Sequence, residues 1–439
     1  MKKGKNVSIN HGAGITIGLC LIVVALLTAV ICGCQKESSG QRGQSGTPRL
    51  VVWSFNEEVG NFIDTYYKPA HPDIAVEYTT TPSDQYMSKL DPLLSANQGA
   101  PDIFVLESRF VRKYVESGAM LDLTDLYEAV KDRLIQYPVE VGSYNGRVYA
   151  LSWQAAPGAM YYRRSLAEKY LGTSDPEKVQ SYFSDINKAL ETAAFLKEQS
   201  GGRCYFVAGI IDLLPLFRAA RSQPWNVNGS LTIDPVMVQL MDIAKTLHDR
   251  GLEARVSQMS EGWFAGVQGT FKDERGDAEI FSYFLPTWGL SYVLKPNGDN
   301  TAGDWAMIQG PVAYQMGGTW LGAWKNTRNP EAAREMVRYL TIDDSFLESL
   351  ARNTGEFVSN TAVIDKIKND YAESFLGGQN HYAAFATMYQ NINGNLFQGT
   401  DQDIEPLFEE AINAYVNSEK TKEQALEDFR DQVANQVGL

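Results

Sequence analysis

The sequence predicts an α/β protein of two lobes, each with a mostly parallel sheet flanked by helices, joined by crossing segments. From Arg49 onward, short apolar runs alternate with helix-like stretches at intervals of roughly 20–30 residues, as in parallel sheets with right-handed crossovers. The chain of 439 residues exceeds the usual size of one domain, which favours two lobes. No repeat with a period of roughly 20–50 residues is present, which argues against a solenoid.

The N-terminal segment is organised as a secretory signal. Lys2, Lys3 and Lys5 precede an apolar run of about 17 residues, 15–31, and small residues follow it. The run is at the short limit for a membrane span, which needs roughly 20 residues, so an uncleaved anchor is the alternative. The ending favours cleavage, because Ile31-Cys32-Gly33-Cys34 resembles the bacterial lipobox. That resemblance implies cleavage before Cys34, a diacylglyceryl thioether on its sulfur and acylation of the new N-terminus. Residues 1–33 are then the signal peptide, and 34–48 a flexible, lipid-anchored tether.

Cysteine content and charge exclude several classes of function. Cys32 and Cys34 have no His, Asp or Glu beside them that could complete a metal site. After cleavage only Cys34 and Cys204 remain, so no internal disulfide is expected. Loss of the leader lowers the Lys and Arg count from 39 to 36 against 53 acids, leaving a net charge of −17. Such a chain is not attracted to nucleic acid or to anionic lipid headgroups.

The first part of the fold predicts strands and helices in alternation. Short apolar runs predict three strands, at 50–55, 74–82 and 100–108. Helix-like stretches follow each strand, over 57–68, 86–98 and 109–117, and Pro69 and Gly118 end the first and the last of them.

The rest of the chain predicts a second α/β set. Two short strands flank Pro157-Gly158, and further strands are expected at 204–211 and 278–283. Helices are expected at 184–199, 235–250, 263–272 and 330–340, and residues 406–437 have amphipathic helical spacing.

Five segments, taken in order, resemble one family of proteins. They are LVVWSF from Leu50, HPDIAVEY from His71, APDIFVLESRFVRKYVESGAMLDLTDL from Ala100, NGRVYALSWQAAPGAMYYRRSL from Asn145 and GGTWLGAWKNTRNPEAA from Gly317. Following a lipobox, they resemble the extracellular solute-binding proteins of bacterial ABC importers, in the branch that includes maltose- and other oligosaccharide-binding proteins. The resemblance extends from about Arg49 to Gln436.

This resemblance implies a periplasmic-binding-protein fold with a ligand cleft between its lobes. One lobe is expected to contain residues 49–155 and 318–358, and the other residues 156–317 and 359–439. Crossings are expected near 154–159, 316–318 and 356–360, where Pro157-Gly158 and Gly317-Gly318 are either hinges or simple turns. The family also implies a monomer without a cofactor or metal, held by its lipid anchor outside the cytoplasmic membrane. Such a receptor delivers its solute to two permease subunits.

Candidate ligand contacts follow from the rule that ligands bind beyond the carboxyl ends of strands. A sugar needs planar hydrogen-bonding groups for its hydroxyls and flat aromatic walls for its apolar ring face. The residues that meet these requirements are Asn56, Glu57, Asp84, Glu107, Trp153, Gln154, Trp225, Tyr283, Trp288 and Trp320. Glu107 is the strongest polar candidate because it directly follows an apolar strand; a solvated loop acid is the alternative. For each Trp the alternative is the core. FSYFLPTWG stands where sugar-binding relatives have a glycine-rich stretch with a Trp, which leaves open whether Tyr283 or Trp288 replaces it.

Two other functions compete with sugar binding. A glycan-cleaving enzyme would need a pair of carboxylates or a nucleophile with its base, and the chain has no G-x-S-x-G or H-E-x-x-H motif. A receptor for a polyamine or another non-sugar solute would need several acids beside aromatics, which Glu57, Asp84 and Glu107 provide.

Overall fold

The first lobe is built on a five-stranded sheet. The computed structural model describes residues 47–439; the signal segment, Cys34 and all of the tether before Thr47 lie outside them. The strands are, in spatial order, β2 (Ala75–Thr80), β1 (Arg49–Ser54), β3 (Ile103–Glu107), β16 (Thr319–Ala323) and β6 (Ala150–Ser152). β2 and β3 pair with β1 in parallel, while β16 runs antiparallel to β3 and to β6. β16 therefore runs opposite to the other four strands, and the sheet is mostly parallel, as predicted.

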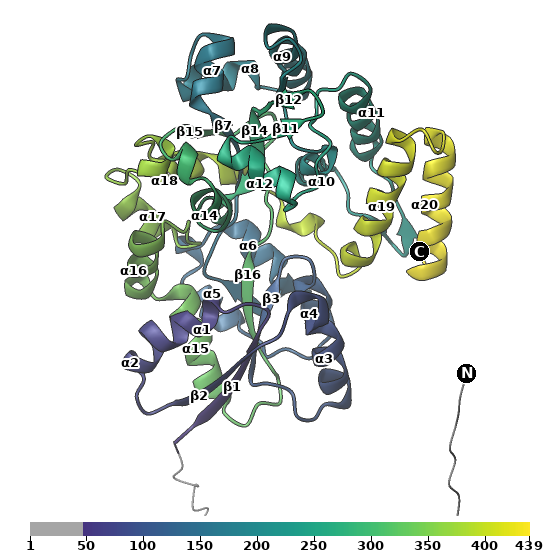
Figure 1. The fold of residues 1–439 in the computed structure, drawn as a ribbon. Coiled ribbons are helices and arrows are strands. Elements are labelled where there is room, and N and C mark those ends of the chain that lie inside the picture. Colours follow the sequence, from purple (N-terminus) through teal and green to yellow (C-terminus); the bar gives the residue numbers. More distant parts are fainter. Residues whose placement is uncertain (1–46) are drawn as a thin grey trace, which may run out of the picture. The chain divides into compact units, whose positions relative to one another are not determined.

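Helices cover both faces of this sheet (Figure 1). The two-residue period of β3 sends Ile103 and Val105 to one face, and Phe104 and Leu106 to the other. The first face packs on helices α1 (Glu58–Phe62) and α15 (Pro330–Ile342), and the second on α3 (Ser83–Ala96) and α4 (Val111–Glu116). A strand that is buried on both faces explains why the sequence of β3 is continuously apolar.

The second lobe has a smaller, three-stranded sheet. β7 (Gly158–Arg163) lies between β14 (Ser282–Pro286) and β15 (Trp305–Ile308), and both pairings are antiparallel. The prediction of a mostly parallel sheet is wrong for these strands. β7 carries the chain away from the first lobe, whereas β14 and β15 lead back toward it, so the pairs must run in opposite directions. Parallel pairing occurs at the margin of the three-stranded sheet, between β8 (Cys204–Tyr205) and β13 (Glu279–Ile280).

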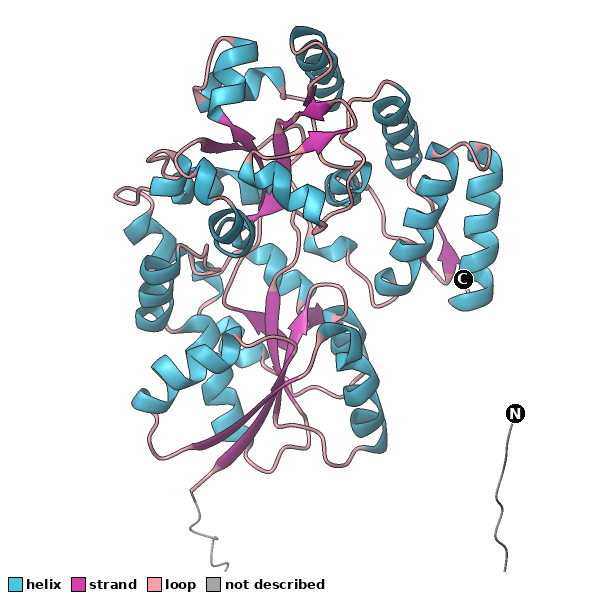
Figure 2. Cartoon of the chain, viewed as in Figure 1, coloured by secondary structure: helices cyan, strands magenta, loops and turns pink. Residues whose placement is uncertain are grey.

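The remaining helices flank the two sheets (Figure 2). Beside the first lobe's strands are α2 (Lys68–Ala70), α5 (Thr124–Glu128), α6 (Gln136–Val141) and α16 (Asp344–Thr354). Between β7 and β14 the chain forms α7 (Arg164–Leu171), α8 (Pro176–Tyr182), α9 (Ile186–Gln199), α10 (Leu214–Ala219), α11 (Pro235–Asp249) and α12 (Glu261–Gln268). After β14 come α13 (Thr287–Gly289), α14 (Lys295–Asn297), α17 (Thr361–Ile367), α18 (His381–Met388), α19 (Asp401–Val416) and α20 (Lys422–Gln436). Two-residue hairpins join β4 (Ser143–Tyr144) to β5 (Arg147–Val148), β9 (Asn226–Val227) to β10 (Ser230–Leu231), and β11 (Lys272–Asp273) to β12 (Gly276–Asp277).

Three chain segments lie side by side where the lobes meet. Ala155 N donates to Phe357 O at 3.1 Å, and Gly158 N donates to Tyr314 O at 2.7 Å. Bridges join Gln154 to Val358 and Pro157 to Gln315. The lobes are thus connected by crossing segments, and the ends of β1, β3, β14 and β16 are brought to the same region. Within residues 47–439, no helix combines the length and the apolar character needed to cross a membrane.

Candidate ligand-binding site

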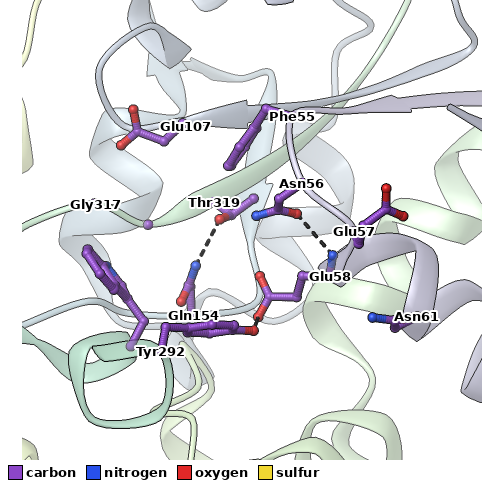
Figure 3. Close-up of a pocket in the computed structure, with 12 residues that line it drawn as sticks. Phe55, Asn56, Glu57, Glu58, Asn61, Glu107, Gln154, Tyr292, Gly317 and Thr319 are labelled. Atoms are coloured by element: carbon purple, nitrogen blue, oxygen red, sulfur yellow. Dashed lines mark hydrogen bonds between the residues drawn. The ribbon is translucent and has the colours of Figure 1, made fainter. Parts of the chain in front are cut away.

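A cavity of about 440 Å³ lies between the lobes, beyond the ends of these strands. Its walls come from the segment after β1, the end of β3, the crossing segments and the turn after β14 (Figure 3). The lining residues are Phe55, Asn56, Glu57, Glu58, Asn61, Glu107, Gln154, Trp288, Tyr292, Gly317, Gly318 and Thr319. This volume lies within the range of roughly 300–1,000 Å³ that is usual for small-molecule sites.

The turn after β1 is held by Asn56. Its Oδ1 accepts a hydrogen bond from Glu58 N at 3.2 Å, and its own N–H donates to Ser54 Oγ at 3.3 Å. These short-range bonds are typical of Asn in turns, and they lead the chain from the strand directly into α1. As a result the side chains of Asn56, Glu57 and Glu58 border the cavity.

Glu107 is anchored by its neighbours in sequence. Oε1 accepts a hydrogen bond from Ser108 Oγ at 2.6 Å, and Oε2 accepts one from Arg109 Nε at 2.7 Å. These bonds fix the carboxylate at the cavity wall. Each oxygen of an ionised carboxylate can accept more than one bond, so Glu107 can still receive a donor from a ligand.

A buried polar chain crosses the floor of the cavity. The Gln154 amide is best satisfied with its oxygen toward Thr319 Oγ1, at 2.9 Å, and its nitrogen donating to Glu356 Oε1, at 3.0 Å. Thr287 Oγ1 also donates to Glu356 Oε1, at 3.0 Å. Burial, and secondly the negative charge of Glu58, raise the pKa of Glu356 to about 8. Gln154 therefore lies in a network that joins segments of both lobes.

Direct contact across the cleft is made by Tyr292 and Glu58. Tyr292 belongs to a π-helical turn, Leu290–Leu294, and its hydroxyl donates to Glu58 Oε1 at 2.7 Å. Burial raises the pKa of Glu58, and the bond from Tyr292 opposes that rise. Tyr292 is still 56% exposed, so its ring stands at the mouth of the cavity.

Aromatic rings supply the apolar part of the wall. Phe55 follows β1, and Trp288 follows β14, where its Nε1 donates to Met316 O at 3.2 Å. Trp288 is half-buried, so that one part of the ring is supported and another faces the cavity. Together with Tyr292 these rings offer the flat apolar surfaces that a sugar ring requires.

The charge of the lining is negative. Glu57, Glu58 and Glu107 are its ionisable acids, and no Lys or Arg lines this cavity in the described part of the chain. No group of three or more His, Cys, Asp or Glu side chains within residues 47–439 is placed to hold a metal ion.

Comparison with known proteins identifies the family. Residues 54–344 match the family described as bacterial extracellular solute-binding protein. The chain belongs to this family. Its members are binding proteins, which confirms that the chain is not an enzyme, and membership implies a location outside the cytoplasm.

Individual solute-binding proteins share the fold at low sequence identity. The arabinooligosaccharide-binding protein of Bacillus subtilis is 23% identical, covering 93% of this chain and 96% of its own. An extracellular solute-binding protein of family 1 superposes with a TM-score of 0.78 at 18% identity, covering 88% of this chain and 99% of its own. An ABC transporter associated binding protein from B. animalis subsp. lactis, solved with β-1,6-galactobiose, gives a TM-score of 0.69 at 20% identity, covering 89% and 97%. These matches confirm the predicted two-lobed fold.

The structure of this solute-binding protein brings together half of the predicted contacts. Asn56, Glu57, Glu107, Gln154 and Trp288 all line the cavity. Asp84 lines a neighbouring cavity instead.

The other four predicted contacts must be corrected, because they are core residues. Trp153, Trp225 and Tyr283 are fully buried, and Trp320 is 1% exposed. Tyr283 Oη donates to Trp263 O at 3.0 Å, and Trp320 Nε1 donates to Pro138 O at 2.8 Å. All four side chains are packed in the apolar clusters of the interior, Trp153 and Tyr283 in one, Trp225 in a second and Trp320 in a third.

Sequence reasoning missed Glu58, Asn61, Tyr292 and Glu356. Glu58 and Asn61 lie in the first turn of α1, one step beyond the strand-end residues that the rule selects. Tyr292 reaches the cavity only through the π-helical turn, for which the sequence carries no local signal. The question between Tyr283 and Trp288 is answered by position: Trp288 is at the cavity, and Tyr283 is in the core.

Proposed function

We propose that this protein is a lipid-anchored receptor that binds a sugar or oligosaccharide between its lobes and delivers it to the permease subunits of an ABC importer. The observation that carries this proposal is the cavity of about 440 Å³, which is lined by aromatic rings together with amide and carboxylate groups. Sugars need both kinds of surface. Relatives described as arabinooligosaccharide- and lactose-binding proteins support it.

The anchor and the partners are proposed on separate grounds. Ile31-Cys32-Gly33-Cys34 supports lipid attachment at Cys34, and several structural relatives are described as components of ABC transporters. We expect the receptor to be a monomer without a cofactor. We also propose the lobe boundaries given above, residues 49–155 with 318–358 and residues 156–317 with 359–439, because β16 returns to the first sheet at Thr319.

Thermal unfolding of the purified full chain tests the ligand class. Arabino-oligosaccharides, β-1,6-galactobiose, lactose and maltose are each added at high concentration. A ligand present at 100 times its Kd stabilises the folded state by about 2.7 kcal/mol, which raises the unfolding midpoint. Because the lipid-anchored chain is purified in detergent, a detergent without a sugar headgroup is used. If none of these sugars shifts the midpoint, sugar binding is rejected.

A polyamine is the second candidate, because Glu57, Glu58 and Glu107 line the cavity without a lining cation in the described residues. Spermidine and putrescine therefore join the panel. Glu57→Gln removes an exposed carboxylate at the cavity, and we expect it to weaken spermidine binding far more than sugar binding. Glu331→Gln, an exposed acid on α15 away from the cavity, is the matched control. A midpoint shift by spermidine alone would replace the sugar with a polyamine.

A further inference from the structure

Glu356 lies beneath the main cavity, where the two lobes are in contact. It stands at the start of the crossing segment 356–360 and is 3% exposed. Its Oε1 accepts hydrogen bonds from Gln154 Nε2 on one side and from Thr287 Oγ1 on the other, each at 3.0 Å. Its main-chain oxygen accepts one from Tyr382 Oη. Glu356 therefore holds the floor of the cavity in place through groups that come from both lobes.

Glu58 brings a second carboxyl group to the same contact. It belongs to α1 of the first lobe, and it accepts a hydrogen bond from Tyr292 of the second lobe at 2.7 Å. Figure 3 shows Glu58 and Tyr292 meeting beside Gln154. After burial, the charge of Glu58 is the chief cause that raises the pKa of Glu356. Two acids that would both ionise in water thus lie close together where the lobes join.

The other ionisable groups around these two acids are neutral phenols. Burial raises the pKa of each phenol, so the hydroxyl groups stay uncharged near neutral pH. The phenols near Glu356 are those of Tyr137, Tyr161, Tyr292 and Tyr382.

Cations on the neighbouring elements have partners of their own. The imidazole of His381 on α18 lies 2.9 Å from Gly355 O through Nε2, and burial lowers its pKa, which keeps the ring neutral. The charged side chains on β7, α14 and α16 are paired with other acids: Arg163 with Asp304, Lys295 with Glu373 and Arg352 with Glu348. A proton is therefore the simplest means of neutralising one of the two carboxylates.

Opening of the cleft changes this environment. Thr287 and Tyr292 belong to the second lobe, whereas Gln154 and Glu58 belong to the first, so the predicted hinge motion separates them. Water then reaches both carboxyl groups, and water favours their ionised form. The contact between the lobes therefore holds a proton more tightly than the open cleft does.

We propose that closing of the lobes around the solute takes up one proton from solvent on Glu356, so that the protein binds its solute more tightly at acid pH. The inference rests on the proposed function, since the solute is what closes the lobes. Glu356 is a positioning residue, because it touches Gln154 and Thr287 beneath the cavity. The sign follows from linkage: the closed state binds more protons, so affinity falls as pH rises.

Isothermal titration calorimetry on the full chain tests this proposal. The probes are arabinotriose, β-1,6-galactobiose, lactose and maltose, none of which titrates between pH 6 and pH 8. Any linked proton therefore comes to the protein. Phosphate and imidazole buffers at neutral pH differ in their heat of ionisation, so the difference between the two binding heats counts the protons taken up. We expect most of one proton per solute, and binding about tenfold weaker at pH 8 than at pH 6.

Glu356→Gln separates proton uptake from a merely structural role. The amide has the shape of the protonated acid and cannot ionise, so the variant should bind at pH 8 as tightly as the wild type does at pH 6. Its binding heat should not depend on the buffer. Asp212→Asn is the matched control, because Asp212 is also a buried acid, 5% exposed, whose pKa burial raises to about 7, but it lies outside the main cavity. This variant should keep the pH dependence of the wild type.

The possible failures are distinguishable. If the wild type binds a sugar without taking up a proton, or if Glu356→Gln takes up as many protons as the wild type, the inference is wrong and the proposed function stands. Loss of affinity in Glu356→Gln at both pH values would assign this residue a structural role only. If the wild type binds none of the sugars, the proposed function falls, and this inference falls with it.

Discussion

Glu356 shows how the site uses a buried acid. Its Oε1 accepts from Thr287, and it lies beside Gln154 at the floor of the cavity. Burial and the neighbouring Glu58 raise its pKa from about 4.5 to about 8. The folded state therefore holds a proton on Glu356 in a pH range where the unfolded chain has released it.

This shift predicts a pH dependence of stability. Below about pH 4.5 both states are protonated, and between about 4.5 and 8 only the folded state is, so the free energy of unfolding falls as pH rises. The slope from this group is at most about 1.4 kcal/mol per pH unit. Glu356→Gln removes this titrating group. We therefore expect the free energy of unfolding of the variant, relative to that of the wild type, to rise between pH 5 and pH 8. Urea denaturation of both proteins at the two pH values measures this change. If the difference in free energy of unfolding between them is the same at pH 5 and pH 8, the prediction is wrong.

The tryptophans show what residue-level prediction can reach. Trp153, Trp225, Trp288 and Trp320 all follow or occupy strands or turns, and the sequence leaves open whether each lies in the core or at the cleft. Only Trp288 lines the main cavity. Trp225 instead packs on Phe408, with ring centres 5.2 Å apart, a contact between residues far apart in the chain. Which way a large ring turns depends on such partners, and these are set by the tertiary fold.

At the scale of elements, the crossing segments are shaped by close packing as well as by glycine. Gly158 begins β7, and a Cβ there would lie 2.0 Å from the ring of Tyr314. Tyr314 is fully buried, and its hydroxyl donates to Ala159 O at 3.0 Å. Gly158 is thus needed for the approach of that ring. Gly317 and Gly318 differ, since their φ values of +71° and +111° favour glycine by backbone conformation. That Pro157-Gly158 or Gly317-Gly318 acts as a hinge stays a prediction.

The contact between Gly158 and Tyr314 predicts a strongly coupled pair of substitutions. Gly158→Ala should lower the free energy of unfolding by about 2–3 kcal/mol, because the added methyl group overlaps the ring. Tyr314→Ala removes the ring. The double variant Gly158→Ala/Tyr314→Ala should therefore lose much less free energy of unfolding than the sum of the losses in the two single variants. Urea denaturation of the two single variants and the double variant measures the coupling. Additive effects would mean that the ring is not what excludes a Cβ at this position.

Helix positions were more predictable than strand pairing. The helix expected at 235–250 is observed as α11, Pro235–Asp249, and Asp234 caps it by accepting from Val236 N. Pro at the first turn and Asp before it are local signals. The pairing of β7 with β14 and β15 joins residues more than a hundred positions apart, and local sequence carries no record of its direction.

At the scale of the whole molecule, two lobes joined by several crossing strands are suited to closing around a solute. The bond from Tyr292 to Glu58 and the network around Glu356 already join groups from both lobes. A ligand that binds between them adds contacts that exist only when the lobes are together, which is the basis of hinge closure.

Anchoring at Cys34 is tested by mass spectrometry of the intact chain. We expect the mature protein to lack Met1–Gly33 and to carry a diacylglyceryl group and an acyl group on Cys34. Cys34→Ala should retain the leader and carry no lipid, because the sulfur is the attachment atom. An unmodified Cys34, or a wild-type chain that retains Met1, would contradict the anchor.

The sequence by itself determined the two-lobed α/β fold, the family and the strand ends at which Asn56, Glu57, Glu107 and Gln154 meet, because these follow from local apolar patterns and from motif order. Only the tertiary structure decided that Trp153, Trp225, Tyr283 and Trp320 are core, that Trp288 lines the main cavity, that Tyr292 reaches across to Glu58, and that Asp84 lines a second cavity. Those outcomes depend on the packing of segments distant in sequence, which fixes side-chain direction and burial, and neither quantity is encoded in a local pattern.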